Sequence, residues 1–477
     1  MTTPDPHLIV LFGATGDLVS RMLMPGLFRV AERYGVLDHT YVMGIAREDH
    51  DAEAFQRLMR LALKHDRHDL GHDAVEAWTG RNLTYYGLGE DDQDYAGLKD
   101  RIEAFERKHH LSGNRLIYLS IPPKAYEVTI EGLGAQGLHD GPGTTQLVVE
   151  KPFGWSLETA QHLNKLVHRY FREEQVYRVD HFVGKETVQN VLAVRFANPL
   201  FSAAWDADAI DHVEINADES LTLEGRAEFY DATGALRDMV QNHLLQMLLF
   251  ATMPSPKAFT AEALHAAKQD VLDAIRPIDP KTDVVFGQYS AGTIGDREVP
   301  AYLDENGIPD DSTTETFAAV RLYIDNDQWR GVPFILRTGK SLNQKCMEIA
   351  IHFKPAHASF LDPGEDPPNV LRLRLSPTPG IHLDFDVKQP GDDFTLSAQS
   401  LDFCFEDEFG ALPHAYESLL YEALTGDRTL FIGAKEVEAA WALFQPVLDA
   451  DVEVHPYASG SKGPDAMQWL YSDKTEA

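Results

Sequence analysis

The sequence has few cysteines and no long apolar run. Only Cys346 and Cys404 occur among 477 residues, too few for a disulfide framework or a four-cysteine zinc site. The apolar run at 244–253 is interrupted by Gln246 and falls far short of the roughly 20 residues that a membrane span needs. The first residues also lack the basic and then apolar pattern of a signal peptide. These absences predict a cytoplasmic protein that does not cross a membrane.

Positive charge is scarce as well. The chain has 42 Lys and Arg against 75 Asp and Glu, which gives a net charge of −33. A surface this acidic repels nucleic acid and anionic lipid, so neither is expected as a partner. It is also typical of a protein that works in a salty cytosol. An anionic ligand would need a pocket in which several of the few basic residues gather.

Short apolar runs alternate with amphipathic stretches in the first part of the chain. This alternation indicates a parallel sheet covered by helices on both faces. Near residue 180 the pattern changes to alternating strands with separate helices, which indicates an α+β domain with a mainly antiparallel sheet. The predicted strands are 7–12, 40–46, 114–120, 146–150, 211–215, 332–336 and 371–375, and the predicted helices are 18–34, 51–64, 232–252 and 413–424.

We therefore predict two domains. Residues 1–179 form an α/β Rossmann-type domain that binds NAD or NADP, and residues 180–477 form a larger α+β domain for substrate binding and oligomerisation. The stretch 361–368, rich in Pro, Gly and Asp, is predicted to be a surface loop. The polar tail from 459 to 477 is predicted to be loose.

A glycine-containing turn follows the first predicted strand. Gly13-Ala14-Thr15-Gly16-Asp17-Leu18 leaves the strand and opens a helix, which is the context of a phosphate-binding turn. Gly13 permits the tight turn, and Gly16 lets the backbone approach a pyrophosphate that the helix N-terminus stabilises. A plain strand-to-helix turn is the alternative, because Thr15 stands where the middle glycine is usual.

Arg47 follows the second predicted strand. Folds that select NAD usually place Asp or Glu there to bind the ribose hydroxyls, whereas an arginine pairs with the 2′-phosphate of NADP. We therefore predict NADP as the cofactor, with NAD possible. A solvated surface arginine is the alternative.

Lys151 and His243 are candidates for chemistry. Lys151 ends a predicted strand in Glu-Lys-Pro, at the edge where parallel sheets bind ligands. His243 lies where a polar stretch becomes an apolar helix, a position that suits a general base. The alternatives are a strand-end turn for Lys151 and a structural role for His243, which is the commoner role of a lone histidine.

The segment around Asp180 is a candidate phosphate site. If a helix begins near His181, then His181 and Lys185 lie on one face, and two such donors suit a phosphate. Asp180 beside them is able to hold a histidine in one tautomer. A solvated, charged helix start is the alternative.

Lys340 and Lys345 follow a glycine turn and are further candidates for an anion site in so acidic a chain. An ordinary solvated turn is the alternative. No metal site is expected, because close ligand spacing is absent among the histidines at these segments: His181, His212 and His243.

Several motifs occur in a characteristic order. They are Gly-x-x-Gly-Asp-Leu from residue 13, Glu-Lys-Pro-Phe-Gly from 150, Tyr-Arg-x-Asp-His-x-x-Gly-Lys-Glu from 177, Arg-Asp-x-x-Gln-Asn-His from 237 and Arg-Thr-Gly-Lys from 337. Together they resemble the glucose-6-phosphate dehydrogenase family, over most of the chain. The resemblance implies oxidation of glucose 6-phosphate at C1 to 6-phosphogluconolactone with hydride transfer to NADP or NAD, the first step of the oxidative pentose phosphate pathway.

The resemblance also implies roles for individual residues. His243 matches the base that removes the C1 hydroxyl proton, and Asp180 matches the carboxylate that orients this base. Lys151 matches a residue between cofactor and substrate. The other matching substrate residues are His181, Lys185, Glu219, Asp238, Lys340 and Lys345, and the matching cofactor residues are Gly13, Thr15, Gly16, Asp17, Leu18 and Arg47.

Two positions depart from the family pattern. Met22 stands where the family usually has a lysine, and Phe182 stands where a tyrosine is common. Each departure removes a polar contact worth roughly 0.5–3 kcal/mol. We expect weaker substrate binding or an altered cofactor preference.

Alternative functions are a dehydrogenase of another phosphosugar or of free glucose, and a catalytically weak paralogue that senses nucleotide. The pair His181 and Lys185 argues against an unphosphorylated sugar, and retention of both Asp180 and His243 argues against a pure sensor. The resemblance implies a homodimer or homotetramer built through the sheet of the second domain. Some family members also bind a second, structural NADP, and the sequence leaves that question open here.

Overall fold

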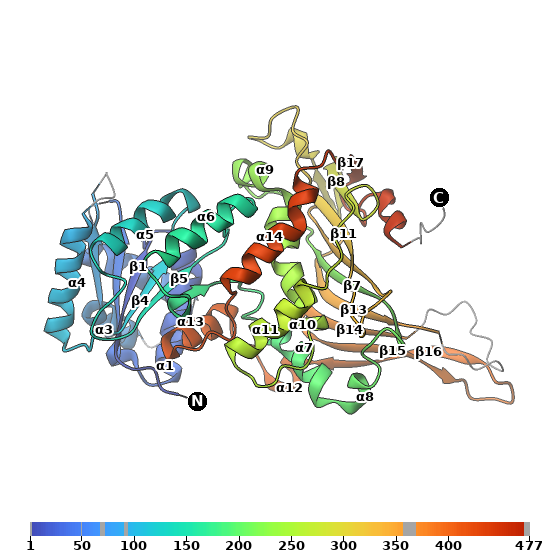
Figure 1. The fold of residues 1–477 in the computed structure, drawn as a ribbon, viewed down its shortest axis with the longest axis horizontal. Coiled ribbons are helices and arrows are strands. Elements are labelled where there is room, and N and C mark those ends of the chain that lie inside the picture. The colour runs from blue at the N-terminus through green and yellow to red at the C-terminus, as the bar shows by residue number, and fades with distance from the viewer. Residues whose placement is uncertain (1, 49, 67–71, 90–93, 356–368, 472–477) are drawn as a thin grey trace. The chain divides into compact units, whose positions relative to one another are not determined.

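The structure is a computed structural model that describes residues 2–48, 50–66, 72–89, 94–355 and 369–471. The chain forms two compact units, drawn in Figure 1. The first unit comprises Met1–Lys185, Lys257–His265 and Pro413–Glu438; the second comprises Glu186–Pro256, Ala266–Leu412 and Ala439–Ala477. The functional division that we predict between residues 179 and 180 stays a prediction, and the loop predicted at 361–368 lies outside the described residues.

The first unit is built on a six-stranded parallel sheet with the order β3-β2-β1-β4-β5-β6. All residues of β1 and β4 are buried, because helices cover both faces of the sheet. This is the predicted Rossmann-type arrangement, which is confirmed. The strands are β1 (His7–Phe12), β2 (Thr40–Ala46), β3 (Leu83–Gly87), β4 (Arg115–Leu119), β5 (Thr145–Val149) and β6 (Val176–Arg178).

Helices of the first unit pack their apolar sides on this sheet. Leu98 and Ile102 of α4, with Leu133 of α5, join the core of β1 and β4. Phe28 of α1 meets Trp78 of α3 edge to face at 5.2 Å. The helices are α1 (Met24–Arg33), α2 (Ala52–Asp66), α3 (His72–Asn82), α4 (Tyr95–His109), α5 (Tyr126–Ala135), α6 (Leu157–His168) and α13 (Ala415–Thr425).

The second unit contains a nine-stranded, mainly antiparallel sheet with the order β16-β15-β14-β13-β7-β12-β11-β8-β17. Only the pairs β7–β12 and β8–β17 are parallel. The predicted α+β class of this part is thereby confirmed. The strands are β7 (Ile210–Asp218), β8 (Val284–Ser290), β11 (Phe317–Tyr323), β12 (Pro333–Gly339), β13 (Cys346–Phe353), β14 (Val370–Ser376), β15 (Gly380–Lys388), β16 (Leu396–Cys404) and β17 (Val454–Ala458), and β9 (Gly292–Ile294) pairs separately with β10 (Arg297–Val299).

A long helical stretch packs against the middle of this sheet. It runs through α9 (Ala227–Ala235), the π-helical segment η5 (Leu236–Leu244) and α10 (Leu245–Thr252), and η5 contacts β7, β11 and β12. All eight residues of α10 are buried, which explains its mainly apolar composition. The remaining helices are α7 (Glu186–Ala197), α8 (Pro199–Ser202), α11 (Ala261–Leu272), α12 (Phe405–Phe409) and α14 (Ala434–Leu448).

The tail is more ordered than its composition suggests. A 3₁₀-helix, η7, spans Asp465–Leu470 and buries Met467 and Leu470 against the second unit's core. Ser459 is also buried and accepts a hydrogen bond from the Ser341 hydroxyl at 2.8 Å. The prediction of a loose tail is therefore wrong for residues 459–471, because Ala466, Met467 and Leu470 are apolar side chains in an otherwise polar stretch and are buried in this core.

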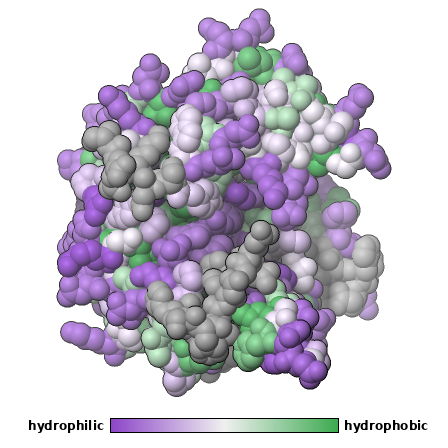
Figure 2. All heavy atoms as spheres, turned by 90° about the vertical axis from the view of Figure 1, so that its right-hand side faces the viewer, coloured by the Kyte–Doolittle hydropathy of each residue, from purple (hydrophilic) through white to green (hydrophobic). Residues whose placement is uncertain are grey.

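None of the helices in the described part of the chain is both long and apolar enough to cross a membrane. On the face drawn in Figure 2, hydrophilic side chains predominate and hydrophobic ones form separate patches.

Candidate active site

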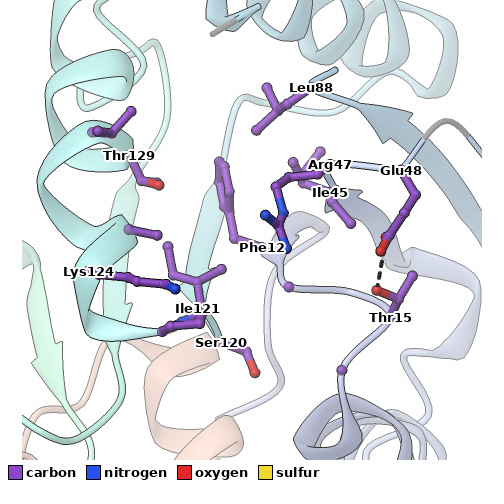
Figure 3. Close-up of a pocket in the computed structure, with 16 residues that line it drawn as sticks. Phe12, Thr15, Ile45, Arg47, Glu48, Leu88, Ser120, Ile121, Lys124 and Thr129 are labelled. Carbon is purple, nitrogen blue, oxygen red and sulfur yellow. Dashed lines mark hydrogen bonds between the residues drawn. The ribbon is translucent and has the colours of Figure 1, made fainter. Parts of the chain in front are cut away.

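A pocket of about 520 Å³ opens at the carboxyl ends of β1, β2 and β4. The chain runs outward from β1 through β2 to β3 and then crosses back to β4 on the other side of β1. Ligands of such sheets bind where the strand order reverses in this way. The volume lies in the usual range for cofactor sites. Figure 3 shows side chains around it that come from the ends of β1, β2 and β4, with Leu88 beyond β3 and Thr129 on α5. Its lining includes Phe12, Gly13, Thr15, Gly16, Ile45, Arg47, Glu48, Leu88, Ser120, Lys124 and Thr129.

The turn after β1 requires glycine at its first position. Gly13 has a φ of +74°, and a Cβ placed there would lie 2.0 Å from the carbonyl oxygen of Ser120. The turn can therefore lie against the loop after β4 only without a side chain at residue 13. A π-helical turn, η1 (Val19–Leu23), follows and continues into α1.

The cofactor residues named from the sequence divide into two groups. Gly13, Thr15, Gly16 and Arg47 all line the pocket. Asp17 and Leu18 open the helix and do not belong to the described lining, and the exposed Asp17 carboxylate pairs with Arg21 at 2.7 Å. Gly13 and Gly16 shape the turn for close approach of a pyrophosphate, so the residues present fit a dinucleotide.

Glu48 and Lys124 line the same pocket and were not anticipated. Glu48 directly follows Arg47, and its carboxylate accepts a hydrogen bond from the Thr15 hydroxyl at 3.4 Å (Figure 3). Lys124 enters from the loop after β4. The signal for Glu48 was its place beside Arg47 at the strand end, where acidic residues bind ribose hydroxyls; Lys124 had no motif to mark it.

Lys151 follows β5 and is joined to Pro152 by a cis peptide bond. The preceding residue, Glu150, is buried and accepts hydrogen bonds from the hydroxyls of Tyr118 at 2.5 Å and Tyr416 at 3.2 Å. Burial raises the pKa of Glu150 to about 7, although both hydrogen bonds and the charge of Lys151 lower it. The backbone that carries Lys151 is thus held by a buried polar cluster, which sequence inspection missed because Tyr416 is distant in the chain.

Asp180, His181 and Lys185 lie beyond the end of β6, but not on a helix. Residues 181–185 form successive turns, and α7 begins only at Glu186. The prediction that His181 and Lys185 share a helix face is wrong, because the Asp180 carboxylate accepts a hydrogen bond from the Phe182 backbone at 2.9 Å and holds a turn instead.

Aromatic rings surround this turn segment. The Lys185 ammonium lies 4.2 Å from the centre of the Phe182 ring, within the range of a cation–π contact. The His181 ring stacks parallel to that of Tyr416, with centres 6.4 Å apart. The two predicted phosphate binders are therefore held near each other by the turn and these rings.

In the second unit, Glu219 and Lys340 follow the adjacent parallel strands β7 and β12. Because carboxyl ends of parallel strands meet at one edge, the two side chains come together, with the Lys340 ammonium 2.5 Å from the Glu219 carboxylate. The ammonium also lies 4.9 Å from the centre of the Tyr230 ring. Lys345 is exposed and directly precedes Cys346, the first residue of β13.

Asp238 and His243 both lie on the π-helical segment η5. Hydrogen bonds in a π-helix join residues five apart, so these two side chains lie one turn from each other. His243 is 1% exposed. Such π-helical segments are rare and often mark functional sites, and the sequence did not predict one here.

Together, the strand order, the glycine turn after β1 and the pocket at the switch point define a dinucleotide-binding domain of the Rossmann type. Comparisons with known proteins add the family. Residues 10–190 match the model of the glucose-6-phosphate dehydrogenase NAD binding domain, and residues 192–477 match the model of the C-terminal domain of the same family. The chain belongs to the glucose-6-phosphate dehydrogenase family, as the sequence motifs predicted.

Individual relatives agree along nearly the whole chain. The glucose-6-phosphate 1-dehydrogenase of Aggregatibacter actinomycetemcomitans is 40% identical over 97% of this chain and 95% of its own length. That of Gluconobacter oxydans is 41% identical over 98% and 96%. A solved glucose-6-phosphate dehydrogenase in complex with its substrate glucose 6-phosphate is similar with a TM-score of 0.90 and 34% identity, over 99% of this chain and 98% of the other.

Proposed function

We propose that this protein oxidises glucose 6-phosphate at C1 to 6-phosphogluconolactone and transfers the hydride to NADP. The observation that carries the proposal is the near full-length likeness to a dehydrogenase solved with glucose 6-phosphate. The dinucleotide pocket and the buried His243 fit the same chemistry. This reaction is the first step of the oxidative pentose phosphate pathway.

In the proposed mechanism, the bound cofactor supplies the hydride acceptor. His243 takes the proton of the C1 hydroxyl as the C1–H bond breaks, so the oxygen's electron pair forms the lactone carbonyl. Asp180 holds His243 in the tautomer that accepts this proton and stabilises the charged ring that results. His181 and Lys185 bind the phosphate, which fixes the far end of the sugar.

Glu219, Asp238, Lys340 and Lys345 are proposed to bind the rest of the substrate, and Lys151 to lie between substrate and cofactor. The ion pair between Lys340 and Glu219 supports part of this assignment. It places a charged donor and an acceptor together, which suits adjacent hydroxyls of a sugar.

The test is reduction of the nicotinamide, followed by absorbance, with wild type and the His243→Asn variant. We expect wild type to turn over glucose 6-phosphate, and kcat to fall by roughly 10²–10⁴-fold in the variant with little change in KM. The exposed His39→Asn variant is the matched control. Asp180→Asn is expected to lower kcat as well.

Glucose and other hexose phosphates serve as competing substrates in the same assay. If another phosphosugar is turned over faster, that sugar is the substrate, and the proposal of an NAD(P)-dependent dehydrogenase still holds. Absence of turnover with every sugar, in protein that still binds NADP, would favour the nucleotide-sensing alternative.

NADP is proposed as the preferred cofactor because Arg47 lines the pocket beyond β2. Its guanidinium suits the 2′-phosphate, and a charge-assisted contact of about 1.5–3 kcal/mol corresponds to roughly 10- to 150-fold in affinity. Arg47→Ala should therefore raise the KM for NADP by at least tenfold and leave the KM for NAD nearly unchanged. Arg57→Ala, an exposed arginine on α2 outside the pocket lining, is the control. Equal effects on both cofactors would contradict the role of Arg47.

We also infer a homodimer or homotetramer formed through the sheet of the second unit. Leu401 and Phe403 on the edge strand β16 are 60% and 37% exposed, and exposed apolar side chains on an open strand edge are typical of an interface. Light scattering should show a multiple of 53.3 kDa that dissociates in Leu401→Glu. The exposed Leu200→Glu of α8 is the control, and a monomeric wild type would contradict the inference.

A cytoplasmic location is inferred from the cysteines. Cys346 and Cys404 are both free thiols, as expected for a protein that folds in a reducing compartment.

A further inference from the structure

Three metal-ligating side chains lie side by side on the second unit's sheet, and none belongs to the proposed active site. His212 and Glu214 are two residues apart on β7, so their side chains leave the same face of the strand. His352 on β13 lies directly opposite His212 in the antiparallel register. Val213 between them and Ile215 after Glu214 are both buried, so the three polar side chains lie on the opposite face of the sheet.

The ligand atoms of these side chains converge. The Nε2 atom of His212 lies 3.8 Å from one Glu214 carboxylate oxygen, and the Nε2 atom of His352 lies 3.9 Å from the other. One ligand atom of each residue lies within 4.8 Å of those of the other two. A tetrahedral ion with bonds of about 2.0–2.2 Å needs ligand atoms roughly 3.3 Å apart, so small side-chain rotations on rigid central strands would close the site.

Neighbouring groups orient the ligands. The Asp211 carboxylate lies 2.7 Å from the Nδ1 atom of His212. This contact favours the tautomer with the proton on Nδ1, which leaves the lone pair on Nε2 facing Glu214. Carboxylate–histidine pairs of this kind are a regular feature of zinc sites, where they fix the ring and raise its basicity. The Tyr471 hydroxyl donates to Glu214 at 2.7 Å and holds the carboxylate in place.

The surroundings of His352 are a second, independent observation that points to a bound group. Its ring stacks on that of His212 with centres 4.1 Å apart. Its Nε2 atom is buried and has no hydrogen-bond partner among the residues that the structure describes. Buried polar atoms of proteins are normally satisfied, so an unsatisfied nitrogen directed at a carboxylate calls for a further group between them.

We propose that His212, Glu214 and His352 form a site for one divalent transition-metal ion, with Zn²⁺ as the best match. Two imidazoles and one carboxylate are a regular zinc ligand set, with water in the fourth position. The site clamps β7 to β13, and through Tyr471 it also secures the end of the described chain. The three side chains are each about one-fifth exposed, so the ion can enter from solvent.

Sequence inspection predicted no metal because it compared histidines close to one another in the chain. His212 and His352 are 140 positions apart and become neighbours only through strand pairing. The local pattern His-x-Glu on a strand was visible, but a two-residue pattern alone is not specific.

The test uses the full-length chain, stripped with EDTA and titrated with Zn²⁺ in competition with a chromophoric chelator. We expect saturation at one equivalent per chain and a Tm that rises with Zn²⁺. His352→Ala and His212→Ala should each weaken binding at least tenfold, and Asp211→Asn should weaken it by roughly 10- to 100-fold. Co²⁺ provides a visible spectrum whose intensity and position report the ligands directly.

Two matched controls exclude other ligands. His455→Ala removes another half-buried histidine of the second unit, and Cys346→Ser removes the thiol at the start of β13; both should bind Zn²⁺ as wild type does. If His352→Ala does not fold, His352→Gln keeps the shape and is examined by its Co²⁺ spectrum. No saturable binding, binding that survives both histidine substitutions, or loss of binding in Cys346→Ser would each overturn the site.

Discussion

Glu150 is a buried carboxyl group whose protonation links pH to stability. Burial raises its pKa to about 7, whereas a glutamate in an unfolded chain has a pKa of about 4.3. The native state therefore holds this proton more tightly than the unfolded state. The resulting stability is fully present below about pH 4.3 and is lost as pH rises through about 7.

The prediction concerns the difference between Glu150→Gln and wild type. Because glutamine does not titrate, the variant should gain stability relative to wild type as pH rises from 5 to 8, by at most about 3 kcal/mol. Thermal unfolding of both proteins across this pH range measures the difference. The exposed Glu174→Gln variant is the control, and a difference that does not change with pH would refute the prediction.

Phe182 and Met22 are the two departures from the family pattern. Phe182 is 4% exposed and lies against the Lys185 ammonium, so a hydroxyl on this ring would add a donor beside a proposed phosphate binder. Phe182→Tyr should lower the KM for glucose 6-phosphate by roughly 2- to 12-fold, the equivalent of a hydrogen bond of 0.5–1.5 kcal/mol. Met22→Lys should lower it as well or shift the cofactor preference. Steady-state kinetics measure both variants, and Phe259→Tyr, at an exposed position, is the control. An unchanged KM for glucose 6-phosphate and an unchanged cofactor preference would contradict the expectation.

At the scale of elements, the contact between the β1 turn and the loop after β4 is the tightest constraint on the cofactor pocket. Gly13→Ala should be strongly destabilising and should abolish cofactor binding, because its Cβ would overlap the Ser120 carbonyl. Gly35 is a matched control. Its φ is also positive, +68°, but a Cβ there meets nothing within 4 Å.

Both Gly→Ala variants carry the cost of a positive φ, so their difference isolates the overlap. NADP binding by fluorescence and the Tm are the measurements. Gly35→Ala should lower the Tm modestly and bind NADP normally. If both variants show the same Tm and the same NADP binding, the close contact between residue 13 and the Ser120 carbonyl does not shape the pocket.

The local pattern of apolar residues predicted an element well where that element is buried along its whole length. β1 and β2 have the predicted bounds because nearly all of their residues are buried and most are apolar. The segment at 181–185 could not be predicted in this way, because the hydrogen bond that the Asp180 carboxylate accepts from the Phe182 backbone N–H competes with the first helical turn. The π-helical segment that carries His243 has the same apolar periodicity as an α-helix, so the sequence predicted a helix of the wrong kind.

Pairings between distant segments set the limit of sequence analysis for the site. The motifs identified the family and thereby its candidate residues, and four of the cofactor residues do line one pocket. Glu150 with Tyr416, and His212 with His352, meet only after the chain has folded. No motif in the sequence links the two residues of either pair, so these contacts could be found only in the folded structure.

At the scale of the whole molecule, the net charge of −33 disfavours the compact state through self-repulsion. Added salt weakens this repulsion, because the Debye length falls from about 30 Å at 0.01 M to about 8 Å at 0.15 M and about 3 Å at 1 M. Repulsion between like charges spread over a surface acts over tens of ångströms and is screened first. Buried ion pairs such as Arg115 with Glu106, 2.7 Å apart, are screened much less.

Salt should therefore raise the Tm, with most of the rise complete by about 0.2 M NaCl. A thermal melt series from 0.01 to 1 M NaCl measures this, and sucrose at matched osmolality separates screening from solvent exclusion. A rise that continues steadily to 1 M in both series would assign the effect to exclusion of solute from the surface. Activity followed in the same NaCl series tests salt adaptation, because an optimum at the lowest salt would show that the acidic surface serves another purpose than work in a salty cytosol.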